Sequence, residues 1–443
     1  MITVGYVLRR SSIEGFAMNG KKARAGAATA LSVLLLAGWY QASAWADPPA
    51  TDPVPMDVSK GEMFRQGGSS YPRLVRLENG GLANGRVLAS MTTYVDNAGR
   101  AVIYESTDDG KSFQPVGEIR DPAGENAKGM CCSTLYELPR QVGDMPAGTL
   151  LWAGTAGVGD DEETRTSSVR LWRSDDHGRN WTFMSDVVAK PPGPGIWEPE
   201  FTVSAEGDLV AFYSDDMDPA HDQKMVQVRS KDGITWTDER DAIKQDEFRV
   251  RPGMAGVRQL PDGTYVMTYE MCNFDPVHTC TVWMRTSPDG WDWGDPYDPG
   301  TEIVSDTGGQ PLGTPTITWA PGDDPNGRLV LAYQMLGGDE GGWAPGNGRT
   351  LMVNDHPSDL STGWREIDAP VHIDHNQGST CRGFSPSVLP TEDGKSLIHV
   401  VTDFEKYIGG PCEAFFGTGP IDGDGDAATA NTGRTPLDPR PGR

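Results

Sequence analysis

The sequence predicts an all-β fold, a six-bladed β-propeller whose blades are four-stranded antiparallel sheets. Its 443 residues include 55 Gly, 34 Pro and 13 Trp. Few long apolar stretches have the period of a helix, so this composition favours many short strands joined by turns. Two local patterns also recur along the chain, a hairpin pattern six times and a turn motif four times. Such repetition indicates stacked supersecondary units, as in a propeller.

Residues 1–46 have the features of a secretory signal peptide and are not expected to belong to the fold. A basic patch, a short apolar stretch and a small-x-small cleavage site follow one another at residues 21–24, 25–37 and 44–46. The alternative, a membrane anchor, requires a longer apolar stretch. We therefore expect a secreted, extracellular protein with no membrane partner after signal cleavage, and a linker over residues 47–60.

Charge and cysteine content bear on the partners and the compartment. The formal net charge of −25 argues against nucleic acid and anionic membranes as partners and favours a neutral substrate. Six cysteines in an exported chain predict disulfides rather than a catalytic thiol. Cys272 with Cys280 and Cys381 with Cys412 are possible pairs, which leaves the adjacent Cys131 and Cys132. The connectivity stays open at this stage.

A turn motif of the form Ser-x-Asp-x-Gly-x-x-aromatic, or one residue shorter, occurs four times, at residues 106–113, 174–181, 230–236 and 287–293. In such a turn Ser and Asp bond backbone amides, and Gly permits a positive φ. The aromatic residue packs back under the turn. We expect these turns to join the third and fourth strands of a blade and to stabilise the hairpin.

A hairpin pattern opens each repeat, at intervals of 53 to 71 residues, starting near Tyr71, Cys131, Glu198, Arg251, Gly313 and Phe384. Six units of this size predict six blades, which we place at residues 61–417. The remaining residues 418–443 are rich in Gly, Asp, Ala and Pro and are expected to form a disordered tail.

The first strand of a blade starts, and the second strand ends, at the same mouth of a propeller. Glu198 precedes Pro199, which favours an extended conformation, and we place it at the start of the first strand of unit three. Glu270 ends the second strand of unit four. We therefore expect the two carboxylates to face one mouth, whereas the turn motifs lie at the opposite face.

Paired carboxylates across a cleft are the catalytic groups of glycoside hydrolysis. Seven further residues near the mouth are expected to bind substrate: Trp197, Tyr269, Arg73, Arg251, Arg382, Asp216 and Tyr407. Each arginine could instead neutralise a nearby carboxylate. Glu200 alternates with Glu198 along the strand, so we expect it to point elsewhere.

No metal or other cofactor is predicted. His372 and His375 are metal ligands in residue type only, because no third ligand accompanies them at a suitable spacing. Residues 422–426 resemble a calcium loop, but Gly433 occupies the position where such a loop needs a bidentate Glu.

The four turns resemble the Asp-box, or BNR repeat, of sialidase-like β-propellers. Within that superfamily the chain is most similar, over about residues 60–416, to the exo-α-1,5-L-arabinanases of glycoside hydrolase family 93. The segments Trp197-Glu198-Pro199 and Tyr269-Glu270 carry this resemblance. It implies retaining release of arabinobiose from linear arabinan, with Glu198 and Glu270 as the catalytic couple. The sequence leaves open which of the two is the acid/base and which the nucleophile; of the two arrangements we favour Glu198 as acid/base and Glu270 as nucleophile. We expect a monomer.

Two other functions stay open. An exo-α-sialidase acting on sialoglycans would use Arg73, Arg251, Arg382, Glu270 and a tyrosine such as Tyr407. Against it, the sialidase motif Phe/Tyr-Arg-Ile-Pro here reads Tyr71-Pro72-Arg73-Leu74. A non-catalytic, carbohydrate-binding propeller is the other alternative. Glu198 and Glu270 on one mouth would favour hydrolysis, whereas a clustered arginine triad would favour a sialidase.

Overall fold

The chain forms a six-bladed β-propeller of four-stranded antiparallel blades, as predicted. The computed structural model describes residues 61–64, 68–95, 98–125, 129–159, 162–360, 363–373, 378–404 and 410–422. All of these fall in one unit, Pro53–Arg443. The predicted signal peptide and linker lie outside the described residues. Among the described residues, no helix is long and apolar enough to cross a bilayer.

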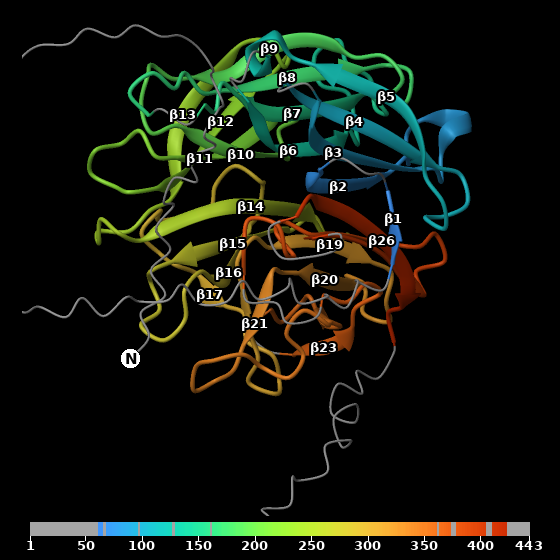
Figure 1. The fold of residues 1–443 in the computed structure, drawn as a ribbon, viewed down its shortest axis with the longest axis vertical. Helices are drawn as coiled ribbons and strands as arrows, with labels where there is room; N and C mark the ends of the chain where they lie inside the picture. Colours follow the sequence, from blue (N-terminus) through green and yellow to red (C-terminus); the bar gives the residue numbers. More distant parts are fainter. Residues whose placement is uncertain are drawn as a thin grey trace, which may run out of the picture. The chain divides into compact units, whose positions relative to one another are not determined.

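The first three blades each consist of four strands consecutive in sequence. In Figure 1 their first strands β2, β6 and β10 lie toward the middle and their fourth strands toward the periphery. The bounds are β2 Ser70–Arg76, β3 Val87–Val95, β4 Ala98–Ser106 and β5 Gln114–Arg120; β6 Met130–Glu137, β7 Leu150–Ala156, β8 Ser168–Ser174 and β9 Thr182–Ala189; β10 Ile196–Val203, β11 Leu209–Asp215, β12 Lys224–Ser230 and β13 Trp236–Ile243. Two short 3-10 helices, η1 and η2, span Gly81–Ala83 and Pro122–Gly124.

Blades four and five are linked by an additional strand pair, β18 and β21. β18 hydrogen-bonds both to β16 of blade four and to β21, which follows the second strand of blade five. The bounds are β14 Arg251–Gln259, β15 Tyr265–Cys272, β16 Thr281–Ser287 and β17 Thr301–Glu302; β18 Gln310–Leu312 and β21 Met335–Gly337; β19 Thr316–Ala320, β20 Arg328–Ala332, β22 Thr350–Asn354 and β23 Trp364–Asp368.

The last blade combines both ends of the described chain. Its sheet order is β1-β26-β25-β24, so the short N-terminal strand β1 (Glu62–Met63) is its outermost strand and closes the ring. The other bounds are β24 Ser387–Pro390, β25 Ser396–Phe404 and β26 Cys412–Pro420. β26 therefore extends beyond residue 417, the end of the propeller that was expected from the sequence. Residues 423–443 lie outside the described residues.

The four repeated turns join the third and fourth strands of blades one to four, as expected. In the third turn the Gly233 amide donates to Ser230 Oγ (2.8 Å), and the amides of Ile234 and Thr235 donate to Asp232 Oδ1 (2.8 Å each). The same Ser and Asp contacts recur in the other three turns. Each turn thus satisfies its own backbone amides with side-chain oxygens.

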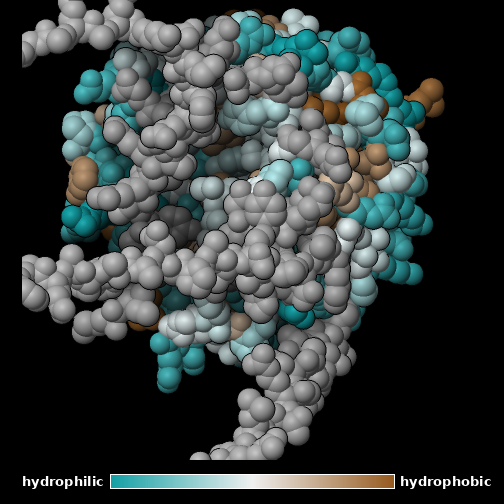
Figure 2. Space-filling model, in the orientation of Figure 1, coloured by the Kyte–Doolittle hydropathy of each residue, from teal (hydrophilic) through white to brown (hydrophobic). Residues whose placement is uncertain are grey.

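Hydrophobic side chains fill the spaces between neighbouring blades. One cluster joins blade two, including Leu151 and Leu171, to blade three, including Phe201 and Tyr213. Among the coloured residues visible in Figure 2, most are hydrophilic, and the hydrophobic ones form small patches. The core therefore runs around the ring between the blades, which leaves the first strands free to shape the mouth.

All six cysteines are paired. The disulfides are Cys272–Cys280 and Cys381–Cys412, as the sequence suggested, and the remaining adjacent residues Cys131 and Cys132 are bonded to each other.

Candidate active site

Each blade has one non-glycine residue with a positive φ near the start of its first strand, either among the first four strand residues or two residues before the strand. In blades one to four this residue coincides with a break in strand register, which marks a β-bulge. The six residues are Tyr71 (φ 49°), Cys132 (61°), Glu198 (62°), Met254 (58°), Thr314 (44°) and Ser385 (53°). Positive φ is uncommon outside glycine and costs free energy, so its recurrence in every blade indicates a feature that the fold maintains.

Glu198 differs in conformation from what the sequence suggested. It was expected to be extended at the first residue of a strand. Instead it is the third residue of β10, lies in the bulge between Trp197 and Glu200, and has a φ of 62°. The proline after it excludes helix but does not by itself impose an extended φ.

The six residues come together around the centre of the ring. Tyr71, Cys132 and Met254, from three different blades, form one buried cluster. The Thr314 amide donates to Glu270 Oε2 (2.6 Å), and the Ser385 amide donates to Thr314 Oγ1 (2.9 Å). The bulges therefore bring side chains and amides from distant parts of the sequence into one mouth.

Glu198 is held by the neighbouring strand and by the next blade. Ser214 Oγ donates to its Oε2 (2.8 Å). A Cβ atom at Gly253 would clash with Gln223 Nε2 and lie 2.8 Å from Ser214 Oγ, so the glycine leaves room for the two side chains that lie beside the Glu198 carboxyl group. The pKa of Glu198 is raised to about 8, first by burial and second by the negative charge of Glu270, while the Ser214 hydrogen bond opposes the shift.

Glu270 lies two residues before the end of β15 and faces the same mouth. Burial raises its pKa to about 7, and the Thr314 amide and the positive charge of Arg251 keep it from rising further. Gly253, the partner of Glu270 in the strand register, also lies beside the Glu198 carboxyl group, so the two glutamates are neighbours at this mouth. The charge of Glu270 accordingly contributes to the raised pKa of Glu198. The Cys272 sulfur lies 3.7 Å from Glu270 Oε1.

Three of the residues predicted to bind substrate form one network beside this pair. Trp197 Nε1 donates to Asp216 Oδ2 (3.0 Å), and Arg251 forms an ion pair with the same oxygen (3.2 Å). Arg251 also pairs with Asp222 (3.1 Å). On the other side, the guanidinium of Arg165 lies 5.2 Å from the centre of the Trp197 ring. These contacts fix the orientation of the indole next to Glu198.

Tyr71 belongs to the site but was not predicted. Its side chain is 8% exposed, and its pKa is raised well above the usual value, first by burial and then by the charge of Glu198, with Glu270 also contributing. The sequence did hold a signal, since Tyr71, like Glu198, precedes a proline in the first strand of its blade. Tyr71 packs with Met254 and against Trp197, the chain neighbours of Gly253 and Glu198, so it lies at the same mouth.

Other predicted binding residues are placed elsewhere. Tyr269 is fully buried in the core of blade four, where its hydroxyl donates to the Pro299 carbonyl, so its prediction as a binding residue was wrong. Successive strand residues point to opposite faces, so Tyr269 cannot share the direction of Glu270. Tyr407 and His375 lie outside the described residues, and His372 is hydrogen-bonded to Asp368 (2.9 Å).

Each of the predicted arginines is bound to other groups of the protein. Arg73 donates to the carbonyls of Pro72 (2.8 Å) and Ser385 (3.3 Å) and to the Ser385 hydroxyl (2.9 Å), so it ties blade one to blade six. Arg382 is buried and pairs with Asp403 (3.3 Å). Together with the pairing of Arg251, these contacts give each arginine separate partners.

Glu200 points away from the mouth, as expected. Its carboxylate accepts a hydrogen bond from Thr134 Oγ1 (2.8 Å) and forms an ion pair with Arg258 (2.9 Å), so it links blades two, three and four. This role is structural.

Within the described ranges, one group of three side chains is close enough to hold a metal ion: Glu270, Cys272 and Cys280. The two cysteines form a disulfide with each other. A thiolate, not a disulfide sulfur, is the metal ligand, so this group does not fit a metal in its oxidised state.

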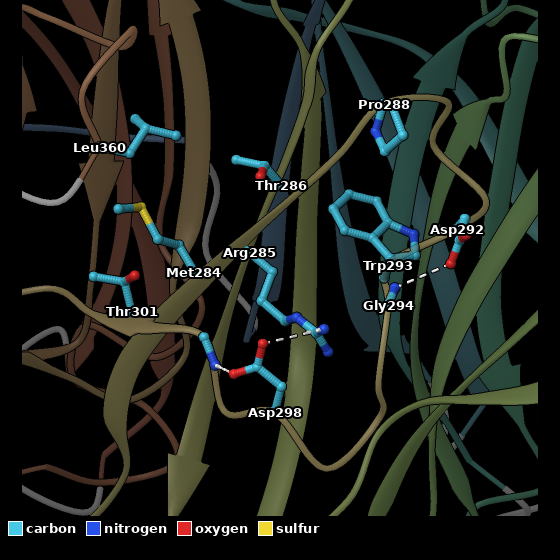
Figure 3. Close-up of a pocket in the computed structure, with 11 residues that line it drawn as sticks. Met284, Arg285, Thr286, Pro288, Asp292, Trp293, Gly294, Asp298, Thr301 and Leu360 are labelled. Atoms are coloured by element: carbon cyan, nitrogen blue, oxygen red, sulfur yellow. Dashed lines mark hydrogen bonds and ion pairs between the residues drawn. The ribbon is translucent and has the colours of Figure 1, made fainter.

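A cavity of about 570 Å³ lies away from the carboxyl pair, beside β16 and the loop that follows it. Figure 3 shows its acidic side chains bound to the surrounding loop. Asp298 accepts from the Gly300 amide (2.9 Å) and faces Arg285 (3.7 Å), and Asp292 accepts from the Gly294 amide (3.1 Å). These carboxylates stabilise the loop, so we place the site at the mouth.

Two solved structures of fungal enzymes are similar to the chain. The GH93 α-L-arabinofuranosidase of Fusarium graminearum in complex with arabinobiose matches with a TM-score of 0.67 and 23% identity, over 83% of this chain and 98% of that one. The α-L-arabinanase of Penicillium chrysogenum complexed with arabinobiose gives 0.66 and 25%, over 83% and 99%. This chain shares their fold.

The Hadza microbial sialidase Hz136 is less similar, with a TM-score of 0.51 and 14% identity over 80% of this chain and 66% of that one. No protein-family model matches the chain, and no curated protein sequence does. The predicted resemblance to the family 93 fold is thus confirmed by structure.

Proposed function

We propose that the protein is a secreted, exo-acting, retaining glycoside hydrolase that releases arabinobiose from α-1,5-arabinan. The observation that carries this proposal is the pair Glu198 and Glu270, two half-buried glutamates from adjacent blades that lie on either side of Gly253 at one mouth. The fold shared with enzymes solved in complex with arabinobiose supports arabinan as the substrate. Three disulfides support an extracellular location.

The pKa values of the two groups support the assignment of roles. Glu198 has the higher pKa, about 8, so it holds its proton at neutral pH and is suited to be the general acid. Glu270 has the lower pKa, about 7, and accepts the Thr314 amide, which stabilises its anion. An ionised Glu270 is the nucleophile.

In this mechanism the reaction takes two steps. Glu198 gives its proton to the glycosidic oxygen while a Glu270 oxygen attacks the anomeric carbon, which breaks the glycosidic bond and forms a covalent glycosyl-enzyme. Glu198, now a carboxylate, then takes a proton from water. The resulting hydroxide attacks the anomeric carbon, displaces Glu270 and restores both groups with net retention of configuration.

The charges around the pair support a neutral substrate. Arg251 is neutralised by Asp216 and Asp222, and Arg382 by Asp403. A sialidase binds the carboxylate of its substrate with arginines, and these arginines are already paired with protein carboxylates. The sialidase alternative is therefore not favoured. The Trp197 ring and the polar edge of Asp216 are suited to orient a neutral sugar.

The test is incubation of the purified mature protein with linear arabinan and, separately, with a sialoside, followed by analysis of the released sugars. Glu198→Ala and Glu270→Ala serve as matched controls. We expect arabinobiose from the wild type and almost none from either variant. Sialic acid release would contradict the proposal, and so would inactivity on both substrates, which would favour the carbohydrate-binding alternative.

A further inference from the structure

The outer edge of the third strand in blade four is only partly covered. On this side β16 pairs with β17 through Trp283 and Met284, and within the described residues the register ends there. In blades one to three the third strand stays paired with the fourth up to the serine of the repeated turn or the residue before it. In blade four, by contrast, no described strand lies beside the residues between Met284 and the turn serine Ser287.

A proline explains the gap. Continuing the register beyond Met284 and Thr301 would place Pro299 opposite Thr286. Proline has no N–H to donate, so it cannot complete a ladder of hydrogen bonds at this position. The chain bends between Pro299 and the strand at Gly300, whose φ of 74° is one that glycine adopts without strain.

The residues that would form the rest of the fourth strand, 294–300, are bound to blade three instead. The Lys244 amide donates to the Pro296 carbonyl (2.9 Å), and the Gln245 side chain donates to the Tyr297 carbonyl (3.2 Å). Lys244 and Gln245 directly follow β13. The cavity of about 570 Å³ beside β16 lies where the fourth strand is missing (Figure 3).

Thr286 presents a pair of backbone groups to this cavity. The Ile303 amide donates to the Val282 carbonyl (2.9 Å), so Val282 faces outward from β16. Backbone groups alternate in direction along an antiparallel strand, so Met284 and Thr286 face outward as well. Thr286 is exposed and lines the cavity. Its N–H and C=O are those that a further strand would use, and an open edge of this kind invites pairing with another segment of chain.

The surroundings of the cavity are acidic. Asp292, Asp295 and Asp298 are exposed, and 59% of the Asp298 side chain is accessible. One arginine, Arg285, lies among them, but it is buried and its guanidinium already donates to the Asp295 carbonyl (2.9 Å). The edge therefore suits an extended segment of polypeptide that carries positive charge.

The described part of the chain ends on the same face as this edge. Asp422 pairs with Arg328 (2.6 Å) and Arg365 (3.5 Å). Arg328 starts the second strand of blade five, and Leu360, which lines the cavity, lies between its third and fourth strands. Both positions are on the face that carries the repeated turns, where Thr286 also lies. The residues after Asp422 therefore start on the correct face, at the neighbouring blade.

The residues that follow match the edge in composition and charge. Residues 427–432 read Ala-Ala-Thr-Ala-Asn-Thr and contain neither a charge nor a proline, so each can donate an N–H. Beyond them the chain contains three arginines and one acidic residue, Arg434, Arg440, Arg443 and Asp438. Ten extended residues span roughly 33 Å, and packed sheets lie about 10 Å apart, so the segment can reach past blade five.

We propose that residues 423–443 dock on the open edge of β16 and take the place that the fourth strand fills in blades one to three. One residue of the run 427–432 exchanges both backbone hydrogen bonds with Thr286, as in an antiparallel pair. The arginines lie beside Asp292 and Asp298. This inference goes beyond the proposed function and does not depend on it, because the edge lies on the face opposite the mouth.

The first test measures hydrogen exchange at the Thr286 amide. The purified mature protein is compared with a truncated protein that ends at Asp422 and so keeps every described residue. We expect the Thr286 amide to exchange at least about tenfold faster in the truncated protein, because its partner is removed. The Ile303 amide, which donates to the Val282 carbonyl, is the internal control and should exchange at the same rate in both proteins.

The second test adds a synthetic peptide of residues 423–443 to the truncated protein and measures binding by fluorescence anisotropy. Thr286→Pro removes the outward N–H, which an edge strand tolerates, whereas Thr286→Val keeps it. We expect the Val variant to bind the peptide like the truncated protein, and the Pro variant to bind it at least about tenfold more weakly. Asp298→Asn keeps an oxygen for the Gly300 amide but removes the charge, so binding should weaken and depend less on salt.

Four results would overturn the proposal. The first is a Thr286 amide that exchanges at the same rate with and without residues 423–443. The second is protection that appears only together with a dimer in size-exclusion chromatography, because a second copy would then be the occupant. The third is no peptide binding at millimolar concentration, about the effective concentration of a linked segment. The fourth is equal binding by the Pro and Val variants or, if the Pro variant does not fold, by Asp298→Asn and the truncated protein.

Discussion

Both faces of the propeller contain a feature that recurs from blade to blade, but on one face it is a set of side chains and on the other a backbone conformation. The turns between third and fourth strands repeat their side chains, since Ser and Asp accept the same amides in four blades. The mouth repeats only a backbone feature, the positive φ at six positions that carry six different side chains. Repeated side chains indicate a common structural task, whereas a repeated backbone with varied side chains indicates a scaffold on which a site is built.

The largest expected effect at the mouth comes from Glu270→Ala. Without a nucleophile the glycosyl-enzyme cannot form, so we expect kcat on arabinan to fall by up to about 10⁶-fold. The loss should be as large on an aryl arabinobioside with a dinitrophenyl leaving group, because a better leaving group does not replace the nucleophile. Steady-state kinetics on both substrates, with circular dichroism to check folding, measures this. Substantial activity on the aryl substrate would contradict the role of Glu270.

Glu198→Ala should separate the two substrates. General acid catalysis contributes about 10²- to 10⁴-fold, so we expect a loss of that size on arabinan. Dinitrophenolate leaves without a proton, so formation of the glycosyl-enzyme from the aryl substrate should be little affected. Pre-steady-state measurement of the dinitrophenol burst tests this. Equal losses of the burst and of arabinan hydrolysis would show that the roles are reversed or that Glu198 is not the acid.

The pH dependence of kcat/KM should be bell-shaped, with its maximum between about 7 and 8. Activity rises as Glu270 loses its proton near pH 7 and falls as Glu198 loses its proton near pH 8. The charge of Glu270 affects the pKa of Glu198, so the two limbs report the pair rather than isolated groups. An optimum below pH 6 would contradict the environment described here for both groups.

A substitution in a turn should have a smaller effect, and on stability alone. Asp232→Ala removes the acceptor of the solvent-exposed Ile234 and Thr235 amides, so we expect a loss of about 0.5–1.5 kcal/mol in the free energy of unfolding. Because the turn lies on the face opposite the mouth, kcat and KM should not change. Denaturant unfolding and kinetics on the same preparation measure this. A changed kcat would contradict the separation of the two faces.

The contrast between recurring side chains in the turns and a recurring backbone conformation at the mouth also explains which features the sequence predicts. Turn hydrogen bonds depend on residue type at fixed offsets, so the sequence identifies them directly. Glu198 and Glu270 were found because strand order alone places them at one mouth. The bulges are backbone features that strand alternation does not reveal, so Tyr71 was missed and Tyr269 was wrongly included. The closing strand β1 has two residues, which is too short for any periodicity.

Asp232 in the turn and Glu198 at the mouth should make the free energy of unfolding depend on pH in opposite directions. The pKa of Asp232 is lowered by the amides of Thr235 and Ile234, so its stabilising effect is present above the pKa of the unfolded chain and is lost as the pH falls. The pKa of Glu198 is raised, so the folded protein keeps a proton that the unfolded chain has already released. Between about pH 4.5 and 8, Glu198 therefore lowers the free energy of unfolding as the pH rises.

Glu198→Gln removes this dependence, because an amide does not titrate. Near pH 4 the variant and the wild type should be similar in stability, and above it the variant should become the more stable protein. The difference should grow by up to about 1.4 kcal/mol for each pH unit until pH 8. Denaturant unfolding at a series of pH values measures it, with Asp232→Ala as the control of opposite sign. A constant difference across this range would show that Glu198 titrates in the mouth as it does in the unfolded chain.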